Sequence, residues 1–490
     1  MTRRFKEFDR SAFFGEVFKV LLPKMHVHMA TGDEWHAHRR LISETMSPAF
    51  LNQVAAPQMW STMQSLIRLW REKARMAEGR PIEFAEDIHK GALEIVWAAT
   101  FGEETGSNRN RADQLAGLKK VRLALDTNAP VEFPEIADPP AFTSINTLSR
   151  SMDIPISSPF PKLHHWLALN CLPKYITARK HTAEMMNAQL RKAKQKYSSP
   201  SMKDDESLVG MKCALDLVIA RELKAAEKEG RKAQTDSQAV YDELFGFLIA
   251  GHETASTTIG WTLKHLTANQ AAQRRLRTAL RESFPNAAKP GALPSVLDIT
   301  STTIPYLEAV IQEAGRVGLT AIGNIRIATV DTELFGYPIP KGTDVFLMHN
   351  GAGTVTEPVP IAESRRSKTS QAAKGKVPDW ETSNMTAFSP ERWLKQNEEG
   401  EVVFDTNAGP NFPFGAGPRG CFGKIIGCLV TIQADNLPGR KWAMLELRIV
   451  PTLIVWSFEL QPTPEALSSW RAIDGVTHRA EQSYLRLKAL

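Results

Sequence analysis

The sequence has few cysteines and lacks any long uncharged apolar run. Its 490 residues include four cysteines, which form neither a CxxC pair nor the spacing of a zinc site. A disulfide scaffold is therefore excluded, and a reducing compartment is expected. No window reaches the roughly 18 apolar residues that a membrane-spanning helix requires. The first twenty residues contain no uncharged apolar core, so neither a signal peptide nor a membrane anchor is predicted there.

Neither sign of charge dominates the chain. Lysine and arginine number 60 against 54 aspartates and glutamates, which gives a formal net charge of +6, and both signs are scattered. This pattern favours an ordinary solvated surface over nucleic-acid binding. A basic face for an acidic protein partner fits equally well. No internal repeat is visible.

The apolar pattern predicts a mainly α fold with a small β region late in the chain. Helical periodicity fills most of residues 35–230, and a long apolar helix is expected over 239–270. Another helix is expected over 305–318, and two strands around a Pro/Gly turn over 332–349. Residues 362–385 lack periodicity and are expected to form an exposed loop. Without a clear linker, the whole chain is expected to form one domain.

The run FGAGPRGCFG, from Phe414 to Gly423, is the strongest motif. A thiolate ligand to a heme iron needs a rigid turn, backbone N–H groups directed at the sulfur, and small residues beside the porphyrin. Glycines such as Gly415 meet these needs, and Arg419 offers a cation for a heme propionate. An isolated cysteine is more often a small buried hydrophobe. Here the complete pattern around Cys421 resembles the heme-binding loop of the cytochrome P-450 family.

The resemblance implies a heme-thiolate monooxygenase similar to the fungal microsomal members of that family. Such an enzyme binds heme b with Cys421 as the axial iron ligand and inserts one oxygen atom of O2 into a small, lipophilic substrate. The expected electron donors are an NADPH-dependent reductase and cytochrome b5. The expected location of the full-length protein is the cytoplasmic face of the endoplasmic reticulum membrane. A member that rearranges peroxides, or a non-catalytic or pseudogene-like product, is the alternative.

The helix expected over 239–270 contains the run Ala-Gly-His-Glu-Thr. A threonine hydroxyl within a helix can replace a backbone acceptor, and an adjacent acid can relay protons. The resemblance implies that Thr254 and Glu253 serve oxygen activation. Gly251 is interpreted as leaving space for the oxygen molecule. The alternative is an ordinary helix that tolerates these polar residues without giving them a function.

Glu313 and Arg316 are spaced to lie on one helix face. Alone, such a pair is more often a surface salt bridge. A second motif, FSPERWL, follows and contains Arg392. The resemblance implies that Glu313, Arg316 and Arg392 form a buried network behind the heme loop, with no part in the chemistry.

Three more residues match positions that hold the heme propionates in the family. Trp35 and Arg39 form a Trp-x-x-x-Arg pattern on an expected early helix, and Arg326 lies on an expected strand. The resemblance implies that all three contact the propionates. Metal ligation is the weaker hypothesis for three histidines that lack a supporting carboxylate pattern: His36, His38 and His252.

The sequence departs from the family in two places. Only 34 residues precede Trp35, so a truncated N-terminus without anchor is expected. After the cysteine, deleting residues 424–439 would bring Ala443 and Glu446 into the family pattern Cys-x-Gly-x-x-x-Ala-x-x-Glu. The segment is in frame and can encode splice signals, which favours a retained intron over a genuine loop insertion. It is expected as a loop or broken helix on the proximal side of the heme.

Overall fold

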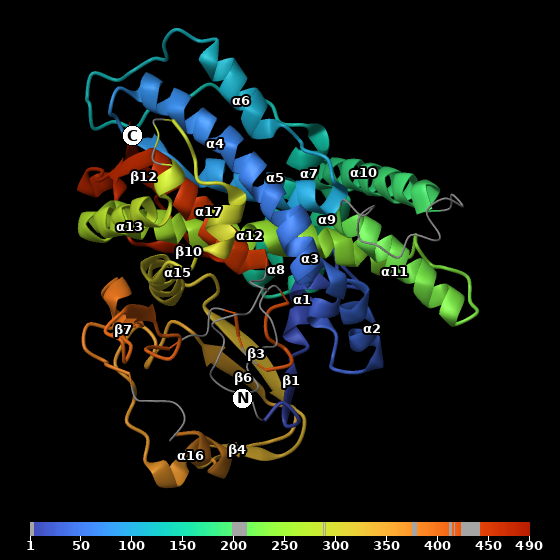
Figure 1. Ribbon diagram of the computed structural model, residues 1–490. Helices are drawn as coiled ribbons and strands as arrows, with labels where there is room; N and C mark the ends of the chain where they lie inside the picture. The colour runs from blue at the N-terminus through green and yellow to red at the C-terminus, as the bar shows by residue number, and fades with distance from the viewer. Residues whose placement is uncertain are drawn as a thin grey trace.

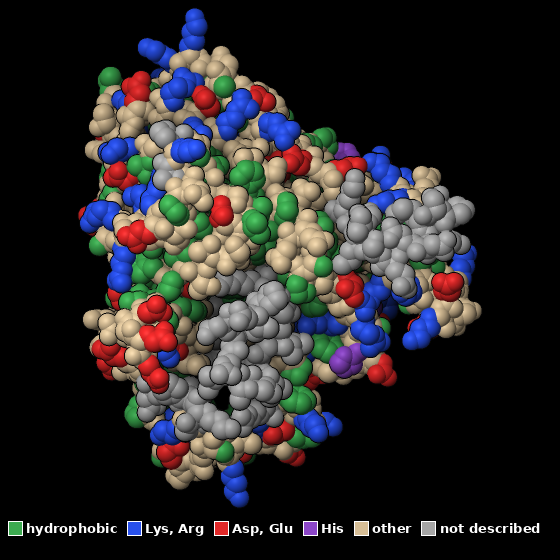
Figure 2. Space-filling view, in the orientation of Figure 1, with side chains coloured by type: hydrophobic (Ala, Val, Ile, Leu, Met, Phe, Trp, Pro, Cys, Tyr) green, Lys and Arg blue, Asp and Glu red, His purple; other side chains and the backbone are tan. Residues whose placement is uncertain are grey.

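A body of helices carries a smaller region of short antiparallel sheets (Figure 1). This computed structural model describes residues 4–197, 213–287, 289, 291–374, 380–410, 414–415, 417–422 and 442–490. The mainly α fold expected from the sequence is confirmed. On the face shown in Figure 2, described charges of both signs are interspersed. None of the described helices is both long and apolar enough to cross a membrane.

Helix α12 (Gln238–Ala268) runs through the centre of the helical body. Its start is capped by Ser237, whose hydroxyl accepts a hydrogen bond from the Val240 N–H. Because its sequence is apolar on most sides, it is enclosed by other helices. Its main helical neighbours are α5 (Ala85–Phe101), α15 (Pro305–Val317) and α17 (Trp442–Ser457). The helices expected over 239–270 and 305–318 are confirmed.

Most of the other helices surround this centre, whereas α16 (Lys368–Lys374) lies apart from it, beside strand β4 (Thr332–Leu334) (Figure 1). The remaining helices are α1 (Phe13–Phe18), α2 (Asp33–Leu41), α3 (Pro48–Phe50), α4 (Ala56–Ala77), α6 (Ser107–Ala116), α7 (Pro140–Ser151), α8 (Asp153–Ile156), α9 (Pro161–Cys171), α10 (Pro173–Tyr197), α11 (Ala214–Lys228), α13 (Gln270–Ser283) and α14 (Val296–Ser301).

The sheets are small. One three-stranded sheet has the order β1–β3–β6, and another has the order β2–β12–β9. Three hairpins, β4–β5, β7–β8 and β10–β11, complete the β region. The strands are β1 (Phe8–Arg10), β2 (Ile82–Glu83), β3 (Gly323–Ala328), β4 (Thr332–Leu334), β5 (Tyr337–Ile339), β6 (Asp344–Met348), β7 (Leu394–Gln396), β8 (Val402–Phe404), β9 (Phe458–Gln461), β10 (Ala472–Asp474), β11 (His478–Ala480) and β12 (Tyr484–Ala489).

Two local expectations were wrong. Residues 332–349 contain three strands instead of two, because Phe335 and Gly336 both adopt positive φ and form an additional tight turn. The polar segment 362–385 is not entirely loop, since it contains a 3₁₀ turn at Glu363–Arg365 and helix α16. A polar helix with no apolar face gives no periodic signal, so the sequence pattern missed it.

Helix α17 follows the suspected insertion directly. Gly423 and the segment 424–439 lie outside the described residues. From Leu445 to Ser457 every residue of α17 is buried, and the helix packs against α4 and α12. The helix after the suspected insertion therefore lies in the core.

Candidate active site

The loop that carries Cys421 is tightly turned. Gly415 and Gly417 have φ angles of +63° and +71°, a backbone region that glycine adopts without steric cost. The Cys421 N–H donates to the Phe414 carbonyl oxygen at 2.8 Å, which closes the turn. The Cys421 side chain is exposed and forms no disulfide. The loop therefore holds Cys421 at an exposed position on a constrained backbone.

Arg419 and Arg39 join this loop to helix α2. The Arg419 guanidinium lies 4.5 Å from the centre of the Trp35 ring, and its Nη2 donates to the Met29 carbonyl oxygen at 2.8 Å. The Arg39 guanidinium lies 4.3 Å from the Phe422 ring centre and 5.4 Å from that of Trp35. Three predicted propionate-binding residues thus lie beside the cysteine loop.

Arg326 reaches the same region from strand β3, together with an arginine that the sequence reasoning missed. Arg10 on β1 is directly opposite Arg326 in the antiparallel register. Burial, followed by the charges of Arg419 and Arg326, holds the pKa of Arg10 well below the usual arginine value. Burial likewise lowers the pKa of Arg419 to about 10. Arg10 belongs to no recognisable sequence motif, so only the pairing of β1 with β3 shows that it lies beside Arg326.

This arginine cluster (Arg10, Arg39, Arg326 and Arg419) fits the anionic edge of a heme. The nearby carboxylate of Asp9 accepts two hydrogen bonds from Thr31, at 2.8 and 2.6 Å. The Nε atoms of Arg10 and Arg419 are buried without a hydrogen-bond partner. Several buried cations with unused donors match a group with two carboxylates, which accepts charge-assisted hydrogen bonds.

One face of helix α12 is exposed. Ala250 and Thr254, one turn apart, are exposed although most of the helix is buried. The Thr254 hydroxyl donates to the Ala250 carbonyl oxygen at 2.7 Å, the back-bonding typical of threonine within a helix. Glu253 points elsewhere, since its side chain is buried. The two predicted catalytic residues are adjacent in sequence but occupy different environments.

The interpretation that Gly251 leaves space for the oxygen molecule was wrong. A Cβ atom at this position would lie 2.7 Å from Cγ2 of Val96 on helix α5. The glycine is therefore required for the close approach of α12 to α5. It does not leave space on the open face that Thr254 occupies.

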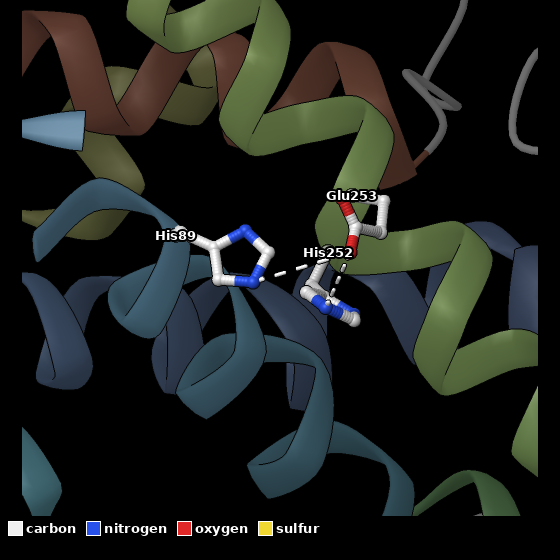
Figure 3. Close-up of side chains that lie close together, drawn as sticks. All are labelled: His89, His252 and Glu253. Atoms are coloured by element: carbon white, nitrogen blue, oxygen red, sulfur yellow. Dashed lines mark ion pairs between the residues drawn. The ribbon is translucent and has the colours of Figure 1, made fainter. Parts of the chain in front are cut away.

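Glu253 lies among polar side chains from α5, α7 and its own helix. Its Oε1 accepts a hydrogen bond from the Ser149 hydroxyl at 2.6 Å, and the Nε2 atoms of His252 and His89 lie 3.6 and 4.0 Å from it (Figure 3). Burial raises the pKa of Glu253, but His252, His89 and Ser149 together leave it lowered overall. Burial lowers the pKa of His252 to about 4. His89 and Ser149 carried no sequence signal.

The structure corrects the view that the candidate metal-ligating histidines lack carboxylates. The His38 Nδ1 lies 2.7 Å from Oε1 of Glu243, and His252 is adjacent to Glu253. His36 is exposed, and its ring packs against Trp35 at 4.8 Å between centres. Both carboxylates belong to α12. Glu243 lies 205 residues after His38 in the sequence, so sequence spacing could not show that pairing.

Glu313, Arg316 and Arg392 come together in a buried network. The two oxygens of Glu313 accept hydrogen bonds from Nε and Nη2 of Arg316, at 2.8 and 2.7 Å. Nε of Arg392 lies 3.7 Å from Glu313 Oε1. The Ser389 N–H and the Trp393 indole N–H also donate to Glu313, at 2.9 and 2.8 Å. Glu313 is 0% exposed, so this is no surface salt bridge.

Comparison with known proteins agrees with this arrangement. The family model described as Cytochrome P-450 matches residues 3–354 and 383–430. A cytochrome P-450 monooxygenase of Pestalotiopsis microspora is 41% identical over 100% of this chain and 82% of its own length. Another, of Fusarium sporotrichioides, is 34% identical over 99% of this chain and 83% of its own.

Solved structures agree on the fold. The heme domain of cytochrome P450DA superposes with a TM-score of 0.65 at 17% identity, covering 99% of this chain and 83% of that one. A family match over most of the sequence, joined to relatives above 30% identity, settles membership. The chain belongs to the cytochrome P-450 family, the heme-thiolate monooxygenases.

Proposed function

We propose that this chain binds heme b with Cys421 as the axial thiolate and oxygenates a small, lipophilic substrate. One observation carries the assignment of the site. Arg419, two residues before Cys421 on the same loop, lies over Trp35 among the other buried arginines. A single rigid segment can therefore hold both the iron and the propionates. When bound, the heme supplies the redox chemistry by which O2 is activated.

On the side of the heme opposite Cys421, the protein's own residues would hold and transfer protons. The Thr254 hydroxyl is exposed on α12 and can exchange its bond to Ala250 for one to a water molecule. Glu253, behind it, is held by Ser149 and can pass a proton toward that water when its side chain turns. Structurally, Glu313, Arg316 and Arg392 would hold the segment after α15 in place without touching the reacting atoms.

We further propose that an NADPH-dependent reductase and cytochrome b5 donate the electrons, and that the protein lies on a membrane surface. Helix α9 and its flanks expose large apolar side chains that soluble surfaces seldom gather: Phe160, Leu163, Trp166, Leu167, Leu172 and Ile176. Such a patch can rest in a lipid interface, from which a lipophilic substrate would enter. NADPH oxidation with purified reductase, measured with and without phospholipid vesicles, checks this part; equal rates would argue against a membrane role.

Cys421→Ser is expected to abolish the red-shifted Soret band of the carbon monoxide complex. Only a thiolate-ligated ferrous heme gives that band, and serine does not supply the thiolate. Cys171→Ser and Cys213→Ser are the matched controls and should keep it. A retained band in Cys421→Ser would refute the axial assignment.

Thr254→Ala is expected to retain heme but release severalfold more of the consumed O2 as hydrogen peroxide. Without the hydroxyl, no side chain on the open face of α12 holds the water that receives the proton. The ratio of NADPH, O2 and peroxide can be measured before any substrate is known. Thr254→Ser keeps the hydroxyl and should resemble the parent, whereas an unchanged ratio in the alanine variant contradicts the role.

A further inference from the structure

The cluster behind Thr254 contains three side chains of the two types, imidazole and carboxylate, that bind transition metals. One atom from each of His89, His252 and Glu253 lies within 4.8 Å of the other two, and all three residues are buried. Figure 3 shows the side chains converging, His89 from α5 and the other two from α12. Two imidazoles and one carboxylate are donors that suit Zn²⁺, whereas Mg²⁺ and Ca²⁺ prefer oxygen alone.

His252 presents an unused lone pair to this cluster. Its Nδ1 lies 2.7 Å from the Leu248 carbonyl oxygen, an atom that can only accept, so Nδ1 carries the proton. In the neutral ring, Nε2 then has a lone pair. That atom is fully buried, has no hydrogen-bond partner, and lies 3.6 Å from Glu253 Oε1. A lone pair beside a carboxylate is unfavourable, and a metal cation bound between the two atoms would remove the repulsion.

The surrounding groups can orient the other ligands. The Ser149 hydroxyl donates to Glu253, and Ser256 Oγ lies 3.4 Å from Nδ1 of His89. A proton on that Nδ1 would leave Nε2 of His89 available as a ligand. In this structure Asn146 Oδ1 accepts a hydrogen bond from this Nε2 at 2.8 Å, so metal binding requires the ring proton to move from Nε2 to Nδ1. Asn146 Oδ1 would then be an oxygen donor beside the ion. Hydrogen bonds of this kind fix ring orientation at known metal centres.

We propose that His89, His252 and Glu253 bind one divalent transition-metal ion, for which Zn²⁺ is the best match. Around a tetrahedral zinc with bonds of about 2.0–2.1 Å, donor atoms lie about 3.4 Å apart. The separations of 3.6 and 4.0 Å between Glu253 Oε1 and the two Nε2 atoms need to close by only a few tenths of an ångström. The site is separate from the cysteine loop and its arginines.

Occupancy would have a functional consequence, which rests on the role proposed for Glu253. A carboxylate bound to Zn²⁺ cannot turn to deliver a proton toward Thr254. Zinc would therefore act as a brake on proton delivery while leaving heme and its thiolate ligand intact.

Equilibrium dialysis of the heme-loaded protein against Zn²⁺ tests the site. The parent should bind one ion that His89→Gln and His252→Gln each bind at least about 100-fold more weakly, since even second-layer changes weaken binding by about 10–100-fold. His164→Gln removes an exposed histidine and should leave binding unchanged. If a glutamine variant fails to load heme, Ser149→Ala replaces it, with an expected loss of about 10–100-fold. The absence of a tight site in the parent, or equal binding by these variants, would overturn the proposal.

A second measurement separates this inference from the role of Glu253. With saturating Zn²⁺ the parent should release more peroxide per O2, and His252→Gln should not respond. Zinc binding without any change in peroxide would leave the metal site standing and count against Glu253 as proton donor. More peroxide from Glu253→Gln without zinc binding by the parent would support the proton role and reject the metal site.

Discussion

Glu313→Ala should lower the free energy of unfolding by about 3–5 kcal/mol and yield protein that contains little heme. The carboxylate is fully buried and neutralises Arg316, which is 1% exposed. Removing it leaves an unpaired buried guanidinium, and that situation costs about 3–5 kcal/mol. Arg316 would keep bonds to three backbone oxygens, those of Thr354, Met385 and Ala387. These carbonyl oxygens carry no negative charge, so they cannot neutralise the guanidinium.

Urea unfolding and heme content per chain are the measurements for Glu313→Ala. Glu391→Gln is the matched control, because Glu391 pairs with Arg275 where both side chains are half exposed. Such a surface pair is worth about 0–1 kcal/mol. A stable, heme-loaded but inactive Glu313→Ala would place Glu313 in the chemistry instead.

Glu446→Gln should remove a loss of stability that the parent undergoes as the pH rises from about 4.5 to about 8. Burial raises the pKa of Glu446 from 4.5 to about 8, with only a partial offset from Trp442. Within the described residues no cation forms an ion pair with it. The folded protein therefore retains a proton that the unfolded chain loses above pH 4.5. Stability is fully present below that pH and falls as the pH rises through about 8.

The full loss corresponds to about 5 kcal/mol, at 1.36 kcal/mol per pKa unit. Urea midpoints at pH 5 and pH 9 provide the test. The parent should lose much more stability between them than Glu446→Gln, whereas Glu391→Gln should follow the parent. Parallel profiles for parent and Glu446→Gln would show that the buried carboxyl does not control alkaline stability.

Sequence reasoning located the residues whose spacing is local. The loop of Cys421, the Ala-Gly-His-Glu-Thr run that contains Thr254 and the pair of Glu313 with Arg316 are each encoded within ten residues. Their positions therefore follow from one turn or one helix face. Which of them touch heme or oxygen stays a prediction.

Contacts between residues that are distant in the sequence could not be predicted in this way. Arg10 meets Arg326 only because β1 pairs with β3 across more than 300 residues. His89 meets Glu253 only because Gly251 lets α5 approach α12. One sequence gives no pattern for such distant pairs.

The suspected insertion also remains a prediction. Residues 424–439 lie outside the described part of the chain, but the family match ends at residue 430, within that segment. The match therefore includes residues 424–430 of that segment.

The pairing of Arg10 with Arg326 has a consequence for how the holoprotein assembles. The Arg10 and Arg326 side chains project from directly opposite positions on the same face of the sheet, so like charges oppose the docking of β1. An anionic cofactor at this edge would act as their shared counterion. Cofactor uptake and closure of the N-terminal strand would then be thermodynamically linked, each strengthening the other. A chain starved of heme would leave its first strand open to proteases, and cofactor supply would set how much folded protein accumulates.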